Sequence, residues 1–491
     1  MASMNRRRFL AVSTAAAASL RSFAQTPKTA TLTLHADKPG PTVPANFIGL
    51  SYETQQLSDP TFFSPHNTGL IEQFRALSTN GVLRIGGNTS DVGWWKPTPT
   101  SKQPPLPANV VLRTPPGEKS PMDLSYAVTP EAVINLRAFL DSTGWTCLYG
   151  INLGSSTPAR AAEEATFVAK TLGAKLEYFQ IGNEADGFPS RFRDKATWNV
   201  EAYLDEWLTA AKAVRAAIPH ARFGMPDVAS HTAWFPTIAD KLGAISNSPE
   251  IAALTHHYYF TGPPSNPNAT LDHLLKTNPR VEKDAALVRD AAVKLHTKYR
   301  MTEGNTCYRG GKPGFSDVFG AALWAADYCL QLASSGYAGV NLHGGDGQMV
   351  ANSLGGHLPG DDLVTDDPAT HPHPYYTPIA HIGSKYIAEP VSFGMKFANS
   401  FAGATMHPVD FAPGINATAY AGTLATGQPI VAIINKDSAP LPLDLSGYAL
   451  ALTLSAASLT STRVSLTEPA SNREVSTVPP YTAVLLRSTR P

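Results

Sequence analysis

This sequence has no formal net charge and few cysteines. Lys+Arg and Asp+Glu number 39 each, so the formal charge is zero, and only 16% of the residues are charged. Nucleic acids and acidic membranes are bound through a basic field, so this balance argues against both as partners. The only cysteines are Cys147, Cys307 and Cys329, without CxxC spacing. We therefore expect no zinc site and no disulfide.

Long hydrophobic runs are also missing. The apolar stretch Phe9–Leu20 is short and rich in alanine, so it is a poor membrane anchor. It follows Arg-Arg-x-Phe-Leu and precedes the small residues of "SFA", a pattern typical of a twin-arginine export signal. We predict a signal peptide at residues 1–24 and a periplasmic or secreted mature protein. A short amphipathic helix is the alternative for this segment.

What the sequence does contain is a series of short strand candidates separated by helical segments. Hydrophobic residues make up 43% of the 491, enough for a large core. The candidates are 47–53, 82–87, 146–153, 178–184, 222–227, 254–260, 299–305 and 339–345. Helices are expected between them, for example over 129–144 and 157–173, where Thr-Pro begins the pattern and Gly ends it.

Eight alternating strand and helix units predict an α/β fold, the (β/α)8 TIM barrel. A doubly wound open sheet is the alternative, but no GxGxxG follows the first strand. From residue 395 the sequence consists of short strand candidates in which apolar and polar residues alternate, separated by Gly, Pro and Asn. This pattern indicates an antiparallel β-sandwich. We assign residues 46–394 to the barrel. Residues 27–45 and 395–491 form the sandwich, which an N-terminal strand in 29–37 joins because a lone strand would be unstable.

Polar residues close most of the predicted barrel strands, and two of them are glutamates. Glu184 ends the fourth strand and Glu303 ends the seventh. The carboxyl ends of all barrel strands meet on one face, where barrel enzymes place their active sites. Two facing carboxylates suit glycoside hydrolysis, with a separation of about 5–5.5 Å in retaining enzymes and roughly 6.5–9.5 Å in inverting ones. The alternative is that each glutamate is paired with an arginine or a helix N-terminus.

Five segments together resemble glycoside hydrolase family 79, the β-glucuronidases and heparanases. They are "LRIGGNTSD", "IGNEADG", "THHYY", "TEGNTCYRGG" and "HPYYTPIAHIG". With the terminal sandwich they span most of residues 29–491, and the chain is most similar to exo-acting bacterial β-glucuronidases. The resemblance implies a catalytic pair in which Glu184 is the general acid/base and Glu303 the nucleophile. It also implies that Asn183 binds the sugar 2-hydroxyl, and that the chemistry needs no cofactor and no metal.

Further substrate-binding residues follow from the same resemblance. A loop after the nucleophile would collect the sugar carboxylate with Tyr308 and with the main chain at Gly310, and Tyr376 would complete the pocket, with Tyr375 as its rival. Strand alternation puts His256 and Tyr258 on one face and His257 and Tyr259 on the other. We predict that His256 and Tyr258 face the substrate and that Tyr258 hydrogen-bonds Glu303. Two more residues would line the sugar subsite, namely Glu53 and Asn88.

These features predict a retaining β-glucuronidase that releases glucuronic acid, or its 4-O-methyl ether, from the non-reducing end of glycans or glycosides. The glucuronide substrate is the partner, with no nucleic acid and no membrane, and a monomer is expected. Three alternatives remain at this point: an endo-acting heparanase-like enzyme, a β-glucosidase or β-xylosidase on the same barrel, and a non-catalytic carbohydrate-binding protein.

Overall fold

The computed structural model describes residues 29–356, 373–471 and 473–489. The predicted signal peptide, residues 1–24, lies outside the described residues. So does the central part of the long segment after the eighth barrel strand, residues 357–372.

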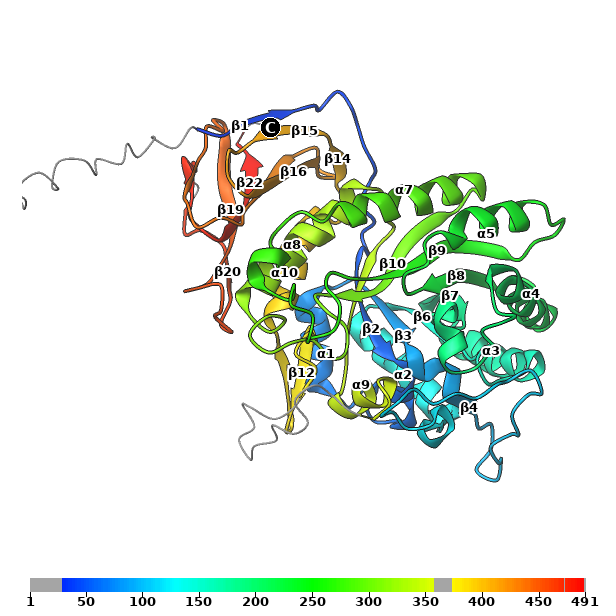
Figure 1. Ribbon diagram of the computed structural model, residues 1–491. Helices are drawn as coiled ribbons and strands as arrows, with labels where there is room; N and C mark the ends of the chain where they lie inside the picture. The colour runs from blue at the N-terminus through cyan, green and yellow to red at the C-terminus, as the bar shows by residue number, and fades with distance from the viewer. Residues whose placement is uncertain (1–28, 357–372, 472, 490–491) are drawn as a thin grey trace, which may run out of the picture.

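A closed barrel of eight parallel strands forms the centre of the molecule (Figure 1). Its strands follow one another in sequence order, and the last, β11, pairs with the first, β2. They are β2 (Ile48–Glu53), β3 (Val82–Gly86), β6 (Thr146–Ile151), β7 (Leu176–Ile181), β8 (Arg222–Val228), β9 (Glu250–Tyr259), β10 (Lys298–Asn305) and β11 (Val340–Gly344). The predicted TIM barrel is confirmed, and the open doubly wound sheet is excluded.

Helices follow the barrel strands as the sequence predicted. They are α1 (Thr68–Leu77), α2 (Pro130–Thr143), α3 (Pro158–Leu172), α4 (Val200–Ala217), α5 (Trp234–Gly243), α6 (Leu271–Leu274), α7 (Pro279–Lys294), α8 (Phe319–Ser334), α9 (Gly347–Ser353) and α10 (Pro390–Ala398). The capping signals work as expected in α2, where Thr129 accepts a hydrogen bond from Ala132 N and Gly144 ends the helix at φ +83°.

The C-terminal region is built on a six-stranded antiparallel sheet. In spatial order its strands are β14 (Thr405–His407), β16 (Ala417–Thr423), β17 (Pro429–Asn435), β22 (Thr482–Ser488), β19 (Tyr448–Ser455) and β20 (Ser465–Thr467). Two small sheets pair β1 (Thr31–Leu34) with β15 (Val409–Ala412) and β18 (Leu441–Pro442) with β21 (Thr477–Val478).

The six-stranded sheet buries both of its faces. Residues of one face, such as Val431 and Ile433, form a core with residues of the small sheets, including β1. Residues of the other face, such as Ile430 and Ala432, belong to the main core shared with the barrel and its helices. On that side Asp327 of α8 binds Lys436 Nζ at 2.6 Å and accepts a hydrogen bond from Tyr420. Figure 1 shows α8 and α10 between the barrel and this sheet.

The predicted boundary at residue 395 falls inside α10. We propose that residues 46–394 form one domain and that residues 27–45 join 395–491 in the other. Two shorter pairs of strands lie in connecting segments of the barrel: β4 (Gly93–Trp95) with β5 (Tyr126–Val128), and β12 (Ile379–Ile382) with β13 (Lys385–Ala388). The first pair brackets a proline-rich segment, residues 96–121, which contributes to the site described next.

Candidate active site

The structure brings Glu184 and Glu303 together at the carboxyl end of the barrel. Glu303 lies in β10, and Glu184 follows β7 in a left-handed conformation, φ +47°, after Gly182 at φ +81°. One oxygen of each carboxylate and a ring nitrogen of His257 all lie within 4.8 Å of one another. This distance is shorter than the roughly 6.5–9.5 Å of inverting glycosidases, which leave room for a water between their carboxylates. The spacing is nearer to that of retaining glycosidases, about 5–5.5 Å.

A buried guanidinium beneath the pair fixes the position of Glu303. Arg84, 1% exposed, donates to Glu303 Oε2 and to Asp227 Oδ2, each at 2.5 Å. It also donates to Asn183 Oδ1 at 2.6 Å. Glu303 is therefore paired with an arginine, as the structural alternative expected, yet it also lines a cavity. The arginine orients the carboxylate without covering it.

His257 connects the two glutamates. Its Nδ1 lies 2.8 Å from Glu184 Oε1 and 3.9 Å from Glu303 Oε2, while its Nε2 lies 3.3 Å from Asp227 Oδ1. Burial opposes a charge on the ring, but Glu303 and Asp227 outweigh burial and raise the pKa of His257 to about 10. The imidazole is therefore a cation that donates to carboxylates on both sides.

The surroundings push the pKa values of the two glutamates apart. Burial raises the pKa of Glu184, although His257 opposes this. Burial also acts on Glu303, but the positive charges of His343, His257 and Arg84 outweigh it and lower the pKa of Glu303 to about 2. Two carboxyl groups with separated pKa values can work as an acid and a base side by side. These directions agree with the predicted roles, a protonated Glu184 and an ionised Glu303.

This separation predicts the pH dependence of activity. As the predicted general acid, Glu184 must carry a proton, so we expect kcat/KM to fall as the pH rises through its raised pKa. His257→Gln removes a positive charge that favours the ionised form of Glu184, so the pKa rises further and the alkaline limb moves to higher pH. The measurement is kcat/KM against pH for the wild type and the variant. His256→Gln, its neighbour outside the site, is the control and should leave the limb in place. A limb that moves to lower pH would contradict the assignment.

The predictions for His256 and Tyr258 are wrong. His256 Nε2 lies 2.8 Å from Tyr337 OH, and the Tyr258 ring stacks on Tyr328 of α8, so both side chains point toward the helices. The Tyr258 hydroxyl makes no hydrogen bond within the described residues. Tyr259 donates instead to Glu303 Oε1 at 2.9 Å.

Pairing between strands explains this correction. The alternation along β9 was predicted correctly, but "HHYY" presents a histidine and a tyrosine on either face, so the sequence gives no sign of which face is inside. Pairing decides it, because Glu303 of β10 lies opposite His257 of β9 after a register shift in β10. Paired residues of parallel strands point to the same side of the sheet, which places His257 and Tyr259 inside.

Tyr259→Phe should lower kcat/KM by about tenfold to a hundredfold, since a hydrogen bond to a charged group is worth about 1.5–3 kcal/mol. Tyr258→Phe is the matched control and should change kcat/KM by less than about twofold, because its hydroxyl is unbonded. The measurement is steady-state kinetics with an aryl glycoside. Equal effects of the two variants would contradict the assignment of Tyr259.

The cavity above the carboxylates has a volume of about 360 Å³. The predicted residues that line it together with the catalytic pair are Glu53, Asn88, Tyr308 and Tyr376. Tyr376 is among them and its rival Tyr375 is not. Two predicted residues lie just behind this lining. Asn183 donates to Asn88 Oδ1 at 3.1 Å, and the Gly310 carbonyl accepts a hydrogen bond from Tyr376 N at 3.3 Å.

Sequence reasoning missed several residues that hold the site together. They are Arg84, Asp227, His257, Tyr259 and His343. Asp227 and His343 lie at polar ends of predicted strands, which is the only sequence signal that they carry. A signal for Arg84 does exist, because a charged residue inside the apolar strand "VLRIG" must find partners in the barrel interior. His343 Nε2 lies 3.3 Å from Glu53 Oε1 and its Nδ1 lies 3.8 Å from Glu303 Oε2, so the ring connects these two glutamates.

The trio of Glu184, His257 and Glu303 has a spacing that could hold a metal ion. The surroundings do not favour a bound cation, because Glu303 and Asp227 raise the pKa of His257 and a protonated imidazole cannot bind a metal. The neighbouring Arg84 adds a second positive charge.

Comparison with known proteins places this site in context. Over 316 residues, 59% of this chain, the sequence is 27% identical to a β-glucuronidase of Aspergillus niger. Over 354 residues, 65% of the chain, it is 25% identical to a β-glucuronidase of Neurospora crassa. The chain is related to fungal β-glucuronidases. The predicted resemblance to such enzymes is thereby confirmed, although these alignments cover only 55% and 61% of the two relatives. No family model matches the chain.

Solved structures agree on the fold. A 4-O-α-L-rhamnosyl-β-D-glucuronidase from Fusarium oxysporum superposes with a TM-score of 0.65 at 19% identity, covering 91% of this chain and 97% of that one. A family 51 arabinofuranosidase from Xanthomonas axonopodis gives a TM-score of 0.64 at 15% identity, covering 94% and 99%. Both are glycoside hydrolases, and at these identities they support the architecture alone.

Proposed function

We propose that this protein is a retaining β-glucuronidase of glycoside hydrolase family 79 that releases terminal β-linked glucuronic acid, or its 4-O-methyl ether. The observation that carries the proposal is the pair of glutamates, within 4.8 Å of each other and with pKa values shifted in opposite directions. The similarity to two β-glucuronidases supports the choice of sugar.

The geometry supports a double displacement. In the first step, the Glu303 carboxylate attacks the anomeric carbon while Glu184 gives its proton to the departing glycosidic oxygen. This forms a covalent glycosyl-enzyme and leaves Glu184 ionised. In the second step, Glu184 takes a proton from a water molecule, whose oxygen attacks the anomeric carbon and releases Glu303. His257 donates to Glu184, which favours the carboxylate form that the second step needs.

Recognition of the sugar carboxylate is assigned to the loop after β10. Tyr308 lines the cavity with 41% of its surface exposed, so its hydroxyl can reach a ligand. The Tyr259 ring lies edge-on to Tyr308, at 6.1 Å between ring centres. The ring centre of Tyr376 lies 6.3 Å from that of Tyr259. Phenol hydroxyls are good donors to a carboxylate, and Tyr308 and Tyr376 both line the cavity, whereas the Tyr259 hydroxyl already donates to Glu303.

Two ion pairs at the wall of the cavity favour exo action over endo action. Glu118, from the proline-rich segment 96–121, lies 3.2 Å from Arg191 and 3.6 Å from Arg309. Arg191 follows β7, Arg309 follows β10, and both line the cavity. The Glu118 carboxylate therefore connects the proline-rich segment to these two loops at the wall of the cavity. An endo-acting enzyme needs a groove that is open at both ends. This connection therefore supports removal of a terminal sugar.

The experiment that tests the proposed function compares p-nitrophenyl β-D-glucuronide with the matching β-D-glucoside. We expect a strong preference for the glucuronide in the wild type and a reduced preference in Tyr308→Phe. A preference for the glucoside would keep the carboxylate pair but overturn the uronate assignment, in favour of a β-glucosidase or β-xylosidase. Failure to release p-nitrophenol from either would favour the endo-acting or the carbohydrate-binding alternative.

Export remains part of the proposal. None of the helices within residues 29–356, 373–471 and 473–489 combines the length and the apolar character that crossing a bilayer would require. The twin-arginine pattern at the N-terminus supports export to the periplasm or beyond. Detection of the mature protein without residues 1–24 in a periplasmic fraction would test it.

A further inference from the structure

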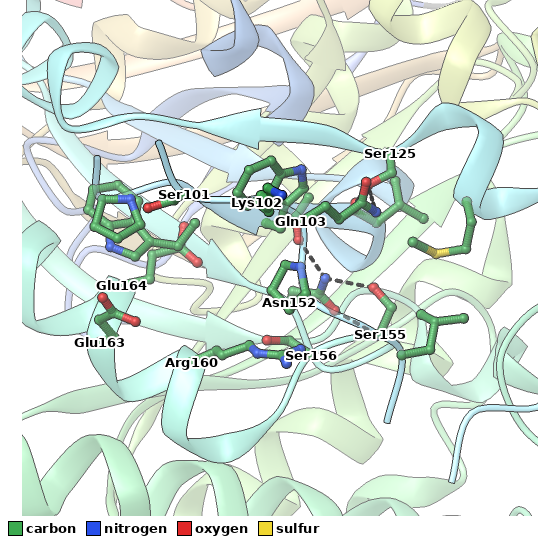
Figure 2. Close-up of a pocket in the computed structure, with 18 residues that line it drawn as sticks. Ser101, Lys102, Gln103, Ser125, Asn152, Ser155, Ser156, Arg160, Glu163 and Glu164 are labelled. Atoms are coloured by element: carbon green, nitrogen blue, oxygen red, sulfur yellow. Dashed lines mark hydrogen bonds between the residues drawn. The ribbon is translucent and has the colours of Figure 1, made fainter. Parts of the chain in front are cut away.

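A second cavity, of about 210 Å³, lies beside the proline-rich segment 96–121 (Figure 2). Its lining comes from this segment, from β4, from the loop after β6 and from α3. It shares no lining residue with the cavity that contains Glu184 and Glu303. The two cavities are therefore separate sites.

Hydrogen bonds hold the proline-rich segment over this cavity. Gln103 Nε2 donates to Ser125 Oγ at 2.9 Å, and Arg160 of α3 donates to the Pro105 carbonyl at 3.2 Å. Figure 2 shows Ser101, Lys102 and Gln103 on one side and Arg160 with Glu163 on the opposite side. The proline-rich segment therefore covers the cavity and is held by hydrogen bonds to Ser125 and to Arg160.

The most informative group in the lining is Glu164. Its side chain is 8% exposed, and its Oε1 accepts a hydrogen bond from Tyr149 at 2.9 Å. A carboxylate can accept several hydrogen bonds, so Glu164 can accept more from a ligand in the cavity that it lines. By contrast, the nearby Asn152 is fully engaged, with Gly93 and Ser155.

The rest of the lining defines what kind of ligand fits. Two acids, Glu163 and Glu164, are balanced by two bases, Lys102 and Arg160, so the cavity favours a ligand without net charge. Trp94 and Trp95 add apolar ring surface. The volume is below the roughly 300–1,000 Å³ of sites for drug-sized ligands, which limits the ligand to about one ring. A ring with an apolar face and several hydroxyls meets all of these conditions.

We propose that this cavity binds one ring of a neutral saccharide and is a second glycan site apart from the catalytic cavity. The hydroxyls of the ring donate to Glu164 Oε2 and accept from Lys102, and its apolar face lies against the tryptophan surface. This inference stands on the lining of the cavity and does not depend on the proposed β-glucuronidase activity.

Ligand-observed NMR titrations of the full-length protein test the proposal, with xylobiose, cellobiose and β-1,4-galactobiose as probes. We expect saturable binding of at least one probe. Trp94→Ala and Glu164→Gln should each weaken it by about tenfold, the equivalent of one good contact. Glu164→Gln is nearly isosteric, so it carries the test if Trp94→Ala does not fold.

Two control variants locate the binding. Lys170→Gln changes an exposed residue in the last turn of α3, outside the cavity, and should leave the affinity unchanged. Tyr308→Ala alters the catalytic cavity and should also leave it unchanged. The proposal is overturned if no probe saturates, if Glu164→Gln binds as the wild type does, or if Tyr308→Ala abolishes binding. None of these outcomes bears on the hydrolysis of p-nitrophenyl glycosides, so a failure here is distinguishable from a failure of the proposed function.

Discussion

Glu303→Gln should reduce kcat by about 10⁴-fold or more, as removal of a nucleophile does in enzymes that act through a covalent intermediate. The amide is almost isosteric with the carboxylate but has no negative charge to attack the anomeric carbon. Its oxygen can still accept the hydrogen bond that Arg84 gives to Oε2, and its NH2 group, in the place of Oε1, can donate to the Tyr259 hydroxyl, so the cavity should keep its shape. The measurement is hydrolysis of p-nitrophenyl β-D-glucuronide, with glucuronic acid binding as a check that the site survives.

Glu250→Gln is the matched control for this variant. Glu250 is an exposed glutamate at the amino end of β9, at the opposite end of the barrel from the site. It should keep wild-type activity. If Glu303→Gln retained substantial turnover, Glu303 would not be the nucleophile. If both variants lost activity alike, the loss would come from a change in the fold.

Arg84→Met should destabilise the protein by about 3–5 kcal/mol, because removing one partner of a buried ion pair leaves the other charge uncompensated. Here two carboxylates, Glu303 and Asp227, would lose the same cation. Activity should fall as well, since the loss of this cation raises the pKa of Glu303. Urea denaturation monitored by circular dichroism gives the free energy of unfolding.

The pH dependence of that free energy distinguishes lost charge pairing from lost packing. In the wild type, the pKa of Glu303 is lowered to about 2 and that of Asp227 is also lowered. Groups of this kind stabilise the fold above their unfolded pKa, about 4, and lose this contribution as the pH falls through the folded value. The difference in free energy of unfolding between the wild type and Arg84→Met should therefore become smaller below about pH 4.

Arg289→Met is the control for the arginine. Arg289 forms an exposed pair with Asp290 at 3.9 Å, and such pairs are worth about 0–1 kcal/mol. A destabilisation by Arg84→Met no larger than this, or a difference that does not depend on pH, would contradict the role of the buried guanidinium.

The sequence alone carried most of the information on architecture. The pattern of apolar residues and the spacing of helix signals located all eight barrel strands, because each strand is a short apolar run bounded by turn or helix signals. The Thr-Pro and Gly signals located α2 and α3 because helix ends need local partners for their free backbone groups. The resemblance to β-glucuronidases rested on short ordered segments, and the relatives confirm it.

The tertiary structure alone decided how the site is assembled. Which face of "HHYY" points inward depends on the register between β9 and β10, and these strands come from distant parts of the chain. The partners of Arg84 come from β8 and β10, so no local pattern could name them. The opposite pKa shifts of Glu184 and Glu303 arise from burial and from nearby cations, which exist only after folding. Local sequence thus determined the elements and the glutamates at their ends, whereas distances and charges between elements determined what those glutamates can do.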